Sequence, residues 1–565
     1  MIRKTIYIIA STIALSACND SLDLYPKDQL SDNTFWKTTA DLETYVNSFY
    51  ESIPGARDNS IADGWDNQVP NNRNTALWGE GIVPASGGGW SSGDWSNIRA
   101  CNYFLTRHQS VEEEHSQYVG EVRFFRAMFY FDKLCQFGEV PFYNKDLQTS
   151  DVEELYKPRD SRTLVVDSIL ADLDYAIQVL PLKKDAVDGR IHKDVASALA
   201  SRVSLFEGTW RKYRGDQTGD AYLQKCITYC EQVMNNGYSI WMGANDPNQN
   251  YYQLFIQEDM SNNPEIIYAK VYDRELNLKH GTTRQMAEST SGLSYDLESS
   301  YLCMDGKSIL ASDLNEGHDS LRQEMKNRDP RMLQTIDNPD HVFTSDDNGG
   351  NPVYHTLPLL RPITGYLMVK FHSPFMHDYD ALDSSIDYPT YRYAEILLNF
   401  AEAKAILGIL TNDDLDRSIN LLRKRVGMPN MTLENVNFDD PGYYDSGYPI
   451  SNLIREIRRE RRVELVGEGF RSNDIKRWKA GKLLENPNAF LGLRVTPEMR
   501  KRFEEQSGGP GTYTRVTTDA PDYLLVSYMD VSPLKWEDRL YLSPLPKDQL
   551  ELNKSLVQNP GWEDR

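Results

Sequence analysis

Apolar side chains recur every three or four residues through much of the chain, which is the spacing of amphipathic helices. Residues 162–180 show it clearly, because Val165, Ile169 and Leu173 fall on one face and Pro181 follows directly. Proline ends a helix since it lacks a backbone N–H and clashes with the preceding turn. The same spacing predicts further helices at residues 121–137, 193–207, 222–235, 391–407, 415–426, 450–466 and 473–480.

The predicted helices follow one another in pairs joined by short turns. Residues 193–207 are rich in small side chains such as Ala196 and Ala200, which let a neighbouring helix approach closely. Paired helices with small inner residues are typical of tetratricopeptide-like packing. Alternating patterns are few, and the candidate strands are residues 266–272, 366–371 and 540–542. We therefore predict a mostly α fold, a tetratricopeptide-like helix-pair scaffold with an irregular loop-rich lobe and a few short strands.

Two stretches do not fit a helical scaffold. Residues 60–96 are crowded with Gly and Asn and hold four Trp residues, and residues 276–365 are long and polar. Long irregular segments on a rigid frame commonly carry binding residues. The predicted organisation is a signal peptide at 1–17, an N-terminal helical region at 18–240 with the Trp-rich loop at 60–96, an irregular lobe at 241–390 and a C-terminal helical region at 391–565.

The first eighteen residues have the layout of a secretory signal. Arg3 and Lys4 precede a short apolar run at residues 6–15, and small residues lead to Cys18. This arrangement is similar to a bacterial lipobox, in which cleavage before the cysteine leaves a thiol for lipidation. Two or more acyl chains anchor a protein firmly, whereas one does not. We predict a lipoprotein attached to the outer membrane through Cys18 and facing the outside.

Charge and cysteine content exclude several classes of function. The formal net charge of −22 argues against nucleic acid, because a polyphosphate partner demands a basic surface. Five widely spaced cysteines remain after Cys18, so no disulfide framework is indicated. Cys226 and Cys230 share a helix face, but no partner completes a metal site, and we expect both to be buried. No cofactor is expected.

The Trp-rich loop combines two ingredients of a sugar site. A pyranose has an apolar C–H face that an aromatic ring covers, and hydroxyls that Asn, Asp and Arg side chains bond. The candidate ligand-binding residues are Trp65, Asp66, Asn67, Arg73, Trp78 and Trp90 in this loop, with Tyr295 and Tyr301 in the irregular lobe. The alternative is that these rings pack the loops onto the helices, as we expect for Trp95.

Several motifs in order along the chain resemble the SusD/RagB family of surface glycan-binding lipoproteins. They are the start at Cys18, RFFRAMFY at 123–130, FGEVP at 137–141, NRDPR at 327–331, RYAEILLN at 392–399, IRRERRVEL at 457–465, EGFR at 468–471, DIKRW at 474–478, YLSPLP at 541–546 and NPGW at 559–562. The resemblance implies four tetratricopeptide-like helix pairs, an irregular lobe with a shallow sugar site, and a lid role over a SusC-like TonB-dependent transporter.

Three further sequence patterns are weaker evidence of function. Residues 89–93 match G-x-S-x-G, but a nucleophile elbow needs a buried strand before it, and residues 85–88 are no such strand. Residues 346–350 have calcium-loop composition, for which a turn is the simpler account. The Arg-rich helix at 455–462 interleaves with Glu residues, which favours intramolecular ion pairs over a polyanion site.

We therefore predict a non-catalytic protein that binds oligosaccharide or polysaccharide at the cell surface for import through a SusC-like transporter. Two alternatives stay open. A surface glycoside hydrolase would need two carboxylates about 5–10 Å apart, and the many acidic residues do not exclude it. A peptide-binding member of the same family would use the helical frame instead. The sequence leaves open whether the glycan is neutral or acidic.

Overall fold

The computed structural model describes residues 35–56, 63–70, 74–355, 362–380, 382–436, 438, 440, 442–444, 446–494, 501, 523–525 and 534–563. The predicted signal peptide, Cys18 and Arg73 lie outside the described residues.

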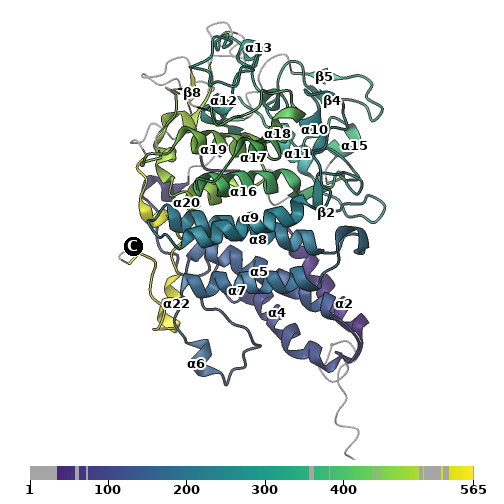
Figure 1. The fold of residues 1–565 in the computed structure, drawn as a ribbon, viewed down its shortest axis with the longest axis vertical. Helices are drawn as coiled ribbons and strands as arrows, with labels where there is room; N and C mark the ends of the chain where they lie inside the picture. The colour runs from purple at the N-terminus through teal and green to yellow at the C-terminus, as the bar shows by residue number, and fades with distance from the viewer. Residues whose placement is uncertain are drawn as a thin grey trace, which may run out of the picture.

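Long helices form a stack through the middle and lower part of the molecule (Figure 1). They are α2 (Thr39–Asn47), α4 (Ser96–Arg107), α5 (Ser116–Phe137), α7 (Arg162–Val179), α8 (Lys193–Lys212), α9 (Gly219–Met234), α16 (Tyr393–Ile406) and α19 (Asn452–Leu465). The shorter helices α17 (Asn412–Asp416), α18 (Ile419–Arg425) and α20 (Arg471–Arg477) adjoin them. Neighbours in this order pack on one another, α5 on α7, α7 on α8, α8 on α9, α9 on α16 and α16 on α19. The mostly helical fold with stacked helix pairs is confirmed.

Small side chains set the spacing of this stack, as the sequence predicts. Ala196 and Ala200 of α8 are fully buried. A Cβ added at Gly208 would lie 2.8 Å from Cδ2 of Leu223 on α9, so a larger residue there would push the two helices apart. All the predicted helices are present, although the one expected at 415–426 is divided into α17 and α18.

The upper part of the molecule is the irregular lobe, built from short helices and loops (Figure 1). The short helices of the chain are α6 (Val152–Leu155), α10 (Asn250–Leu254), α11 (Thr282–Ala287), α12 (Tyr295–Ser300), α13 (Leu321–Glu324), α14 (Pro330–Leu333), α15 (Met376–Tyr379) and α22 (Lys547–Leu552). The hydrophobic cluster of the irregular lobe includes Leu293, Leu297, Tyr301 and Met332, together with Val463 of α19. The helical stack therefore forms the floor on which the lobe sits.

The strands form four separate antiparallel pairs, β1 with β3, β2 with β6, β4 with β5 and β7 with β8. Their bounds are β1 (Gln68–Val69), β2 (Ile266–Lys270), β3 (Gly292–Leu293), β4 (Val342–Thr344), β5 (Val353–Tyr354), β6 (Tyr388–Arg392), β7 (Leu491–Arg494) and β8 (Tyr523–Leu525).

Only one of the three predicted strands forms, at β2. Residues 366–371 make a single bridge from Met368 to Ile336, and Phe371 turns the chain with φ 70°. Their side chains are buried throughout, so apolar content there reflects a lobe core rather than a strand face. Residues 540–542 fall on a 3-10 turn at Asp538–Tyr541 instead. The predictions for these two segments were wrong.

Two smaller expectations are also tested. Cys101, Cys135, Cys226, Cys230 and Cys303 are all buried and unpaired, which confirms the prediction of no disulfide among them. None of the helices in the described part of the chain is long and apolar enough to cross a membrane.

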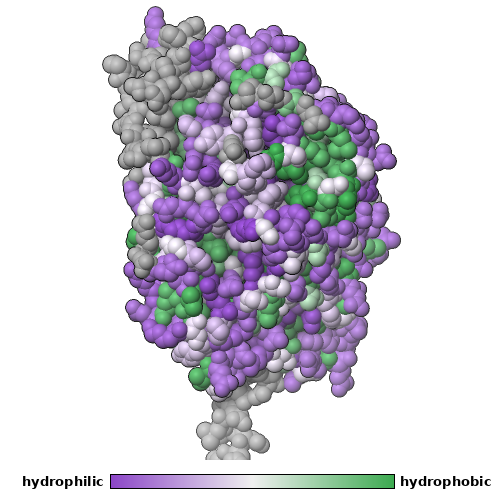
Figure 2. All heavy atoms as spheres, turned by 60° about the vertical axis from the view of Figure 1, so that its left-hand side comes forward, coloured by the Kyte–Doolittle hydropathy of each residue, from purple (hydrophilic) through white to green (hydrophobic). Residues whose placement is uncertain are grey.

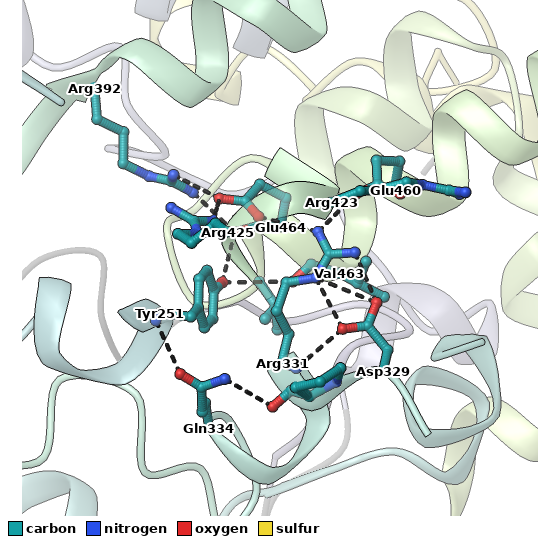
Figure 3. A network of polar contacts seen from close by, with 12 residues as sticks. Tyr251, Asp329, Arg331, Gln334, Arg392, Arg423, Arg425, Glu460, Val463 and Glu464 are labelled. Atoms are coloured by element: carbon teal, nitrogen blue, oxygen red, sulfur yellow. Dashed lines mark hydrogen bonds and ion pairs between the residues drawn. The ribbon is translucent and has the colours of Figure 1, made fainter. Parts of the chain in front are cut away.

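A buried network of ion pairs joins α19 to the lobe (Figure 3). Glu464 of α19 accepts hydrogen bonds from Arg331 at 3.0 Å and Arg392 at 2.7 Å, and it also pairs with Arg425. All four side chains are at most 1% exposed. Burial alone would raise the pKa of Glu464, but the three guanidinium groups hold that pKa well below its usual range.

The Arg-rich helix is ion-paired as predicted, within the helix at Glu456 and otherwise with partners from other elements. Glu460 bonds Arg331 at 2.6 Å and Arg423 at 2.9 Å, and Arg461 bonds Asp474 of α20 at 2.9 Å. The charges along α19 therefore fix the helix against its neighbours, and few of them stabilise the isolated helix.

We expect Glu464→Ala to lower the free energy of unfolding by about 3–5 kcal/mol, because it leaves three buried guanidinium groups short of a counter-ion. Urea unfolding at neutral pH measures the change. Asp340→Asn is the matched control, since the exposed pair Arg322–Asp340 at 3.0 Å should contribute about 1 kcal/mol or less. Equal effects of the two substitutions would contradict this role of Glu464.

Candidate functional site

A tight turn at residues 63–67 carries the first tryptophan of the predicted site. Asp63 accepts hydrogen bonds from the backbone N–H of Gly467 at 2.8 Å and from Nδ2 of Asn67 at 2.7 Å. Asn67 in turn accepts one from Nε of Arg462 at 2.7 Å. Burial raises the pKa of Asp63. The turn is thus attached to α19 and to the residues that follow it.

Asp66 makes the strongest of these attachments. Its carboxylate receives two parallel hydrogen bonds from Arg471 of α20, at 2.7 Å and 2.6 Å, and lies 3.5 Å from Arg462. Paired N–H donors of this kind give both energy and fixed geometry. Burial by itself would raise the pKa of Asp66, but Arg462 and Arg471 hold that pKa at about 2. Asp66 therefore stays ionised, and its carboxylate positions the turn.

Trp65 adopts a left-handed backbone conformation with φ 71°. A bulky side chain disfavours this region by roughly 1–3 kcal/mol, and such residues collect at ligand sites when their surroundings hold them in place. The bonds of Asp63, Asp66 and Asn67 supply that constraint here. The half-buried indole of Trp65 is directed to the ring of Trp536, with centroids 5.6 Å apart.

Trp65 and Trp78 border the same depression, which we call the tryptophan hollow. Its lining residues are Gly64, Trp65, Pro70, Asn74, Leu77, Trp78, Ser472 and Phe490, around a cavity of about 220 Å³. Trp78 ends a 3-10 turn at Thr75–Trp78 and packs edge-to-face on Phe490, with centroids 5.5 Å apart. Both indoles are half-buried, so each keeps part of a ring surface open.

A second depression, the arginine hollow, borders the 63–67 turn through Asp66. It has a volume of about 150 Å³ and is lined by Asp66, Tyr295, Asp296 and five arginines of α19 and α20, among others. Asp296 accepts a hydrogen bond from Arg462 at 2.7 Å and another from Asn486 at 2.6 Å. The described carboxylates here are engaged in ion pairs, which makes them framework groups.

The structure divides the predicted ligand residues among three places. Trp65 and Trp78 share the tryptophan hollow, whereas Asp66 and Tyr295 line the arginine hollow. Trp90 lines neither; it packs on Phe137 of α5, with centroids 4.8 Å apart, and borders a separate groove. The Trp-rich loop therefore does not present its rings as one platform.

Two other predicted residues lie below the surface. Asn67 is 1% exposed and bonds within the turn, and Tyr301 has no exposed surface at all. Tyr301 belongs to the core of the lobe, so its ring offers no face to a sugar in this conformation. Arg73 lies outside the described residues.

The hollow also contains residues that sequence reasoning missed. Asn74 caps the 3-10 turn, accepting from the N–H of Ala76 at 3.1 Å, and its side chain lines the hollow beside Trp78. Asn74 lies inside the polar stretch already singled out, so its residue type was a usable signal. Ser472 and Phe490 come from segments some 400 positions further along, and no spacing in the sequence connects them with Trp65.

Two clusters among the described residues place three ligand atoms within 4.8 Å of one another, Glu258 with His377 and Asp378, and Glu298 with His318 and Glu324. In each cluster, an arginine side chain already forms an ion pair with the carboxylates. Arg274 lies 3.3 Å from both Glu258 and Asp378, and Arg328 lies 2.7 Å from Glu298. These guanidinium groups supply the positive charge that a metal ion would bring. Residues 346–350 form the turn between β4 and β5, as predicted.

Comparison with protein families gives two consecutive matches. Residues 89–205 match the model described as starch-binding associating with outer membrane, and residues 204–562 match the SusD family. The second match alone covers more than half of the chain. The chain belongs to the SusD family. The resemblance inferred from the sequence motifs is thereby confirmed.

Individual relatives agree with this assignment. SusD-like protein P2 of Formosa agariphila is 24% identical over the full length of both chains. The crystal structure of a SusD-like protein from Bacteroides fragilis is 25% identical, with a TM-score of 0.70, covering 95% of this chain and 100% of that one. A laminarin-binding SusD-like protein, 18% identical with a TM-score of 0.53, shares the fold over 93% of this chain and 100% of its own.

We expect the ion pairs of Asp66 to make stability depend on pH. Its folded-state pKa of about 2 lies below the ordinary value of 3.8, so its contribution is present above about pH 4 and is lost as the pH falls toward 2. Asp66→Asn should lower the free energy of unfolding by about 2 kcal/mol at pH 7 and by much less at pH 2. Urea unfolding at several pH values measures this.

The substitution Asp340→Asn controls for the loss of one exposed acidic charge. A deficit of Asp66→Asn that stays constant from pH 7 to pH 2 would show that the carboxylate charge does not hold the turn.

Proposed function

We propose that this SusD-family protein is a non-catalytic, cell-surface receptor for oligosaccharides, which it passes to a SusC-like TonB-dependent transporter for import. The observation that carries the proposal is the tryptophan hollow, where two partly open indole rings stand beside an amide and a hydroxyl side chain. Indole faces cover the C–H faces of sugar rings, and Asn74 and Ser472 supply neutral hydrogen-bonding groups. Family membership supports the same conclusion.

The chemistry of the hollow favours binding over hydrolysis. None of its described lining residues is an Asp or a Glu. Glycoside hydrolysis uses a pair of carboxyl groups, one of them with a raised pKa so that it can donate a proton. Asp66, which lines the arginine hollow instead, is held in the ionised form and paired with Arg471, which suits neither role.

Rigid presentation is the second argument for a binding role. The left-handed backbone at Trp65 is maintained by buried hydrogen bonds, so the indole is already in place before a ligand arrives. Pre-organised rings avoid the entropic cost of ordering a loop on binding. A receptor of this kind recognises a sugar face and holds it weakly enough to release it.

We expect Trp65→Ala and Trp78→Ala each to weaken oligosaccharide binding by about 1–2 kcal/mol, because each removes one stacking surface. Isothermal titration with neutral oligosaccharides, including those of starch and laminarin, measures this. Trp241→Ala is the matched control, since Trp241 is also half-buried but packs on a different cluster. Unchanged affinity in both hollow variants, or release of reducing ends from the sugars, would overturn the proposal.

We also propose that lipid on Cys18 attaches the protein to the outer membrane beside its transporter. The apolar run at residues 6–15 and the small residues before Cys18 support this. Cells grown with labelled palmitate should incorporate label into the wild-type protein and not into Cys18→Ser, and the wild type should co-purify with a TonB-dependent transporter from detergent extracts. Equal labelling of the two proteins would contradict the anchor.

A further inference from the structure

A hollow larger than the tryptophan hollow lies beside another predicted sugar-binding ring, Trp90. It is a groove of about 670 Å³ between the loop around Trp90 and the segments of α6 and α22, and the two linings share no residue. Its size falls within the roughly 300–1,000 Å³ of small-molecule sites. We refer to it as the helical groove.

Four aromatic rings line the helical groove. Trp90 and Trp95 meet edge-to-face with centroids 5.3 Å apart, and Tyr143 and Tyr156 complete the set. Trp90 is only 6% exposed and is the more buried ring, whereas Tyr156, at the end of α6, is 44% exposed. Figure 2 turns this side of the molecule forward and shows apolar patches between hydrophilic side chains in its lower half.

The loop that carries Trp90 and Trp95 is fixed in place. Gly87, Gly88 and Gly89 have φ values of 77°, 63° and 90°, a conformation that suits glycine alone over three successive residues. Lys133 donates a hydrogen bond to the carbonyl of Gly89 at 2.6 Å, and Gln136 donates one to that of Gly88 at 3.0 Å. Trp90 and Trp95 are therefore set before any ligand binds, whereas Tyr156 is carried by a different segment, at the end of α6.

The polar part of the groove comes from α22 and the residues after it. Asp548, Gln549 and Asn553 stand opposite the rings, and Asp548 is the only charged residue among the described lining residues. Asp548 is half-buried, so part of its side chain is open at the groove. A carboxylate accepts hydrogen bonds, and a sugar hydroxyl is a suitable donor to it.

We propose that the helical groove is a second carbohydrate-binding site, taking a neutral oligosaccharide whose ring faces lie on Tyr156 and Trp95 and whose hydroxyls donate to Asp548. The one charged residue in the described lining is a carboxylate, which disfavours an anionic glycan. Lys133 and Lys157 lie against the rings of Trp95 and Tyr143 without lining the groove. None of the described strands borders the groove, so an extended peptide finds no edge to pair with. The inference rests on the proposed receptor function, since two sites on one protein would hold one polymer by avidity.

The test uses the double variant Trp65→Ala/Trp78→Ala, in which the first site is removed. We expect this protein to retain measurable binding of maltoheptaose or laminarihexaose in isothermal titration. Adding Tyr156→Ala should weaken the residual affinity by about tenfold or more, whereas Tyr156→Phe keeps the ring and should retain it. Tyr354→Ala is the matched control, because Tyr354 on β5 is also 44% exposed but lies outside both linings.

The outcomes separate the two proposals. Wild-type protein that binds neither sugar would overturn the receptor function and the second site together. Binding that disappears fully in the double variant, or residual binding that Tyr156→Ala leaves unchanged, would overturn the second site alone. If Tyr156→Ala instead reduces co-purification with the transporter and leaves sugar binding intact, the groove is a protein contact surface and the inference is wrong.

Discussion

The buried charges of α19 are the constraint on which the rest of the structure depends. Glu464 and Glu460 bind arginines that come from α14, β6 and α18, and so tie the lobe and the C-terminal helices to one helix. Buried ion pairs add little net stability compared with apolar packing, but a missing partner is costly. The network therefore specifies how the segments meet, because other arrangements would leave a charge unpaired.

The same helix determines where the binding surface lies. Arg462 of α19 and Arg471 of α20 hold Asn67 and Asp66 across 395 and 405 positions of sequence. Trp65 lies between two anchored residues, Asp63 and Asp66, so the backbone that carries its indole is fixed on both sides. The tryptophan hollow is in this sense a product of the charged core, and its described lining residues come from the loop at 64–78 and from residues 472 and 490.

The helical scaffold was predictable from sequence because each long helix carries a local signal. The apolar spacing at Val165, Ile169 and Leu173 and the small residues of α8 are properties of single segments. Residues 366–371 show where that reasoning ends, since a mostly apolar run in a lobe core, here containing the buried Lys370, has a composition similar to that of a buried strand. The family motifs added the connection between segments that periodicity lacks.

The sequence predicted which types of residue form the site, but not how these residues are arranged in space. Trp65 and Trp78 stood out in a polar stretch, but the sequence did not show that Trp90 faces a different groove or that Tyr301 is buried. Phe490 and Ser472 reach the hollow through tertiary contacts alone. Which ring faces are open depends on long-range packing, and one sequence does not encode that packing in any short pattern.

A crystal structure of the protein with a bound oligosaccharide tests the central claim most directly. The account predicts electron density for a pyranose ring lying against the indole of Trp65 or Trp78, within hydrogen-bonding reach of Asn74. Sugar density that is absent from the tryptophan hollow and present elsewhere on the molecule would contradict it.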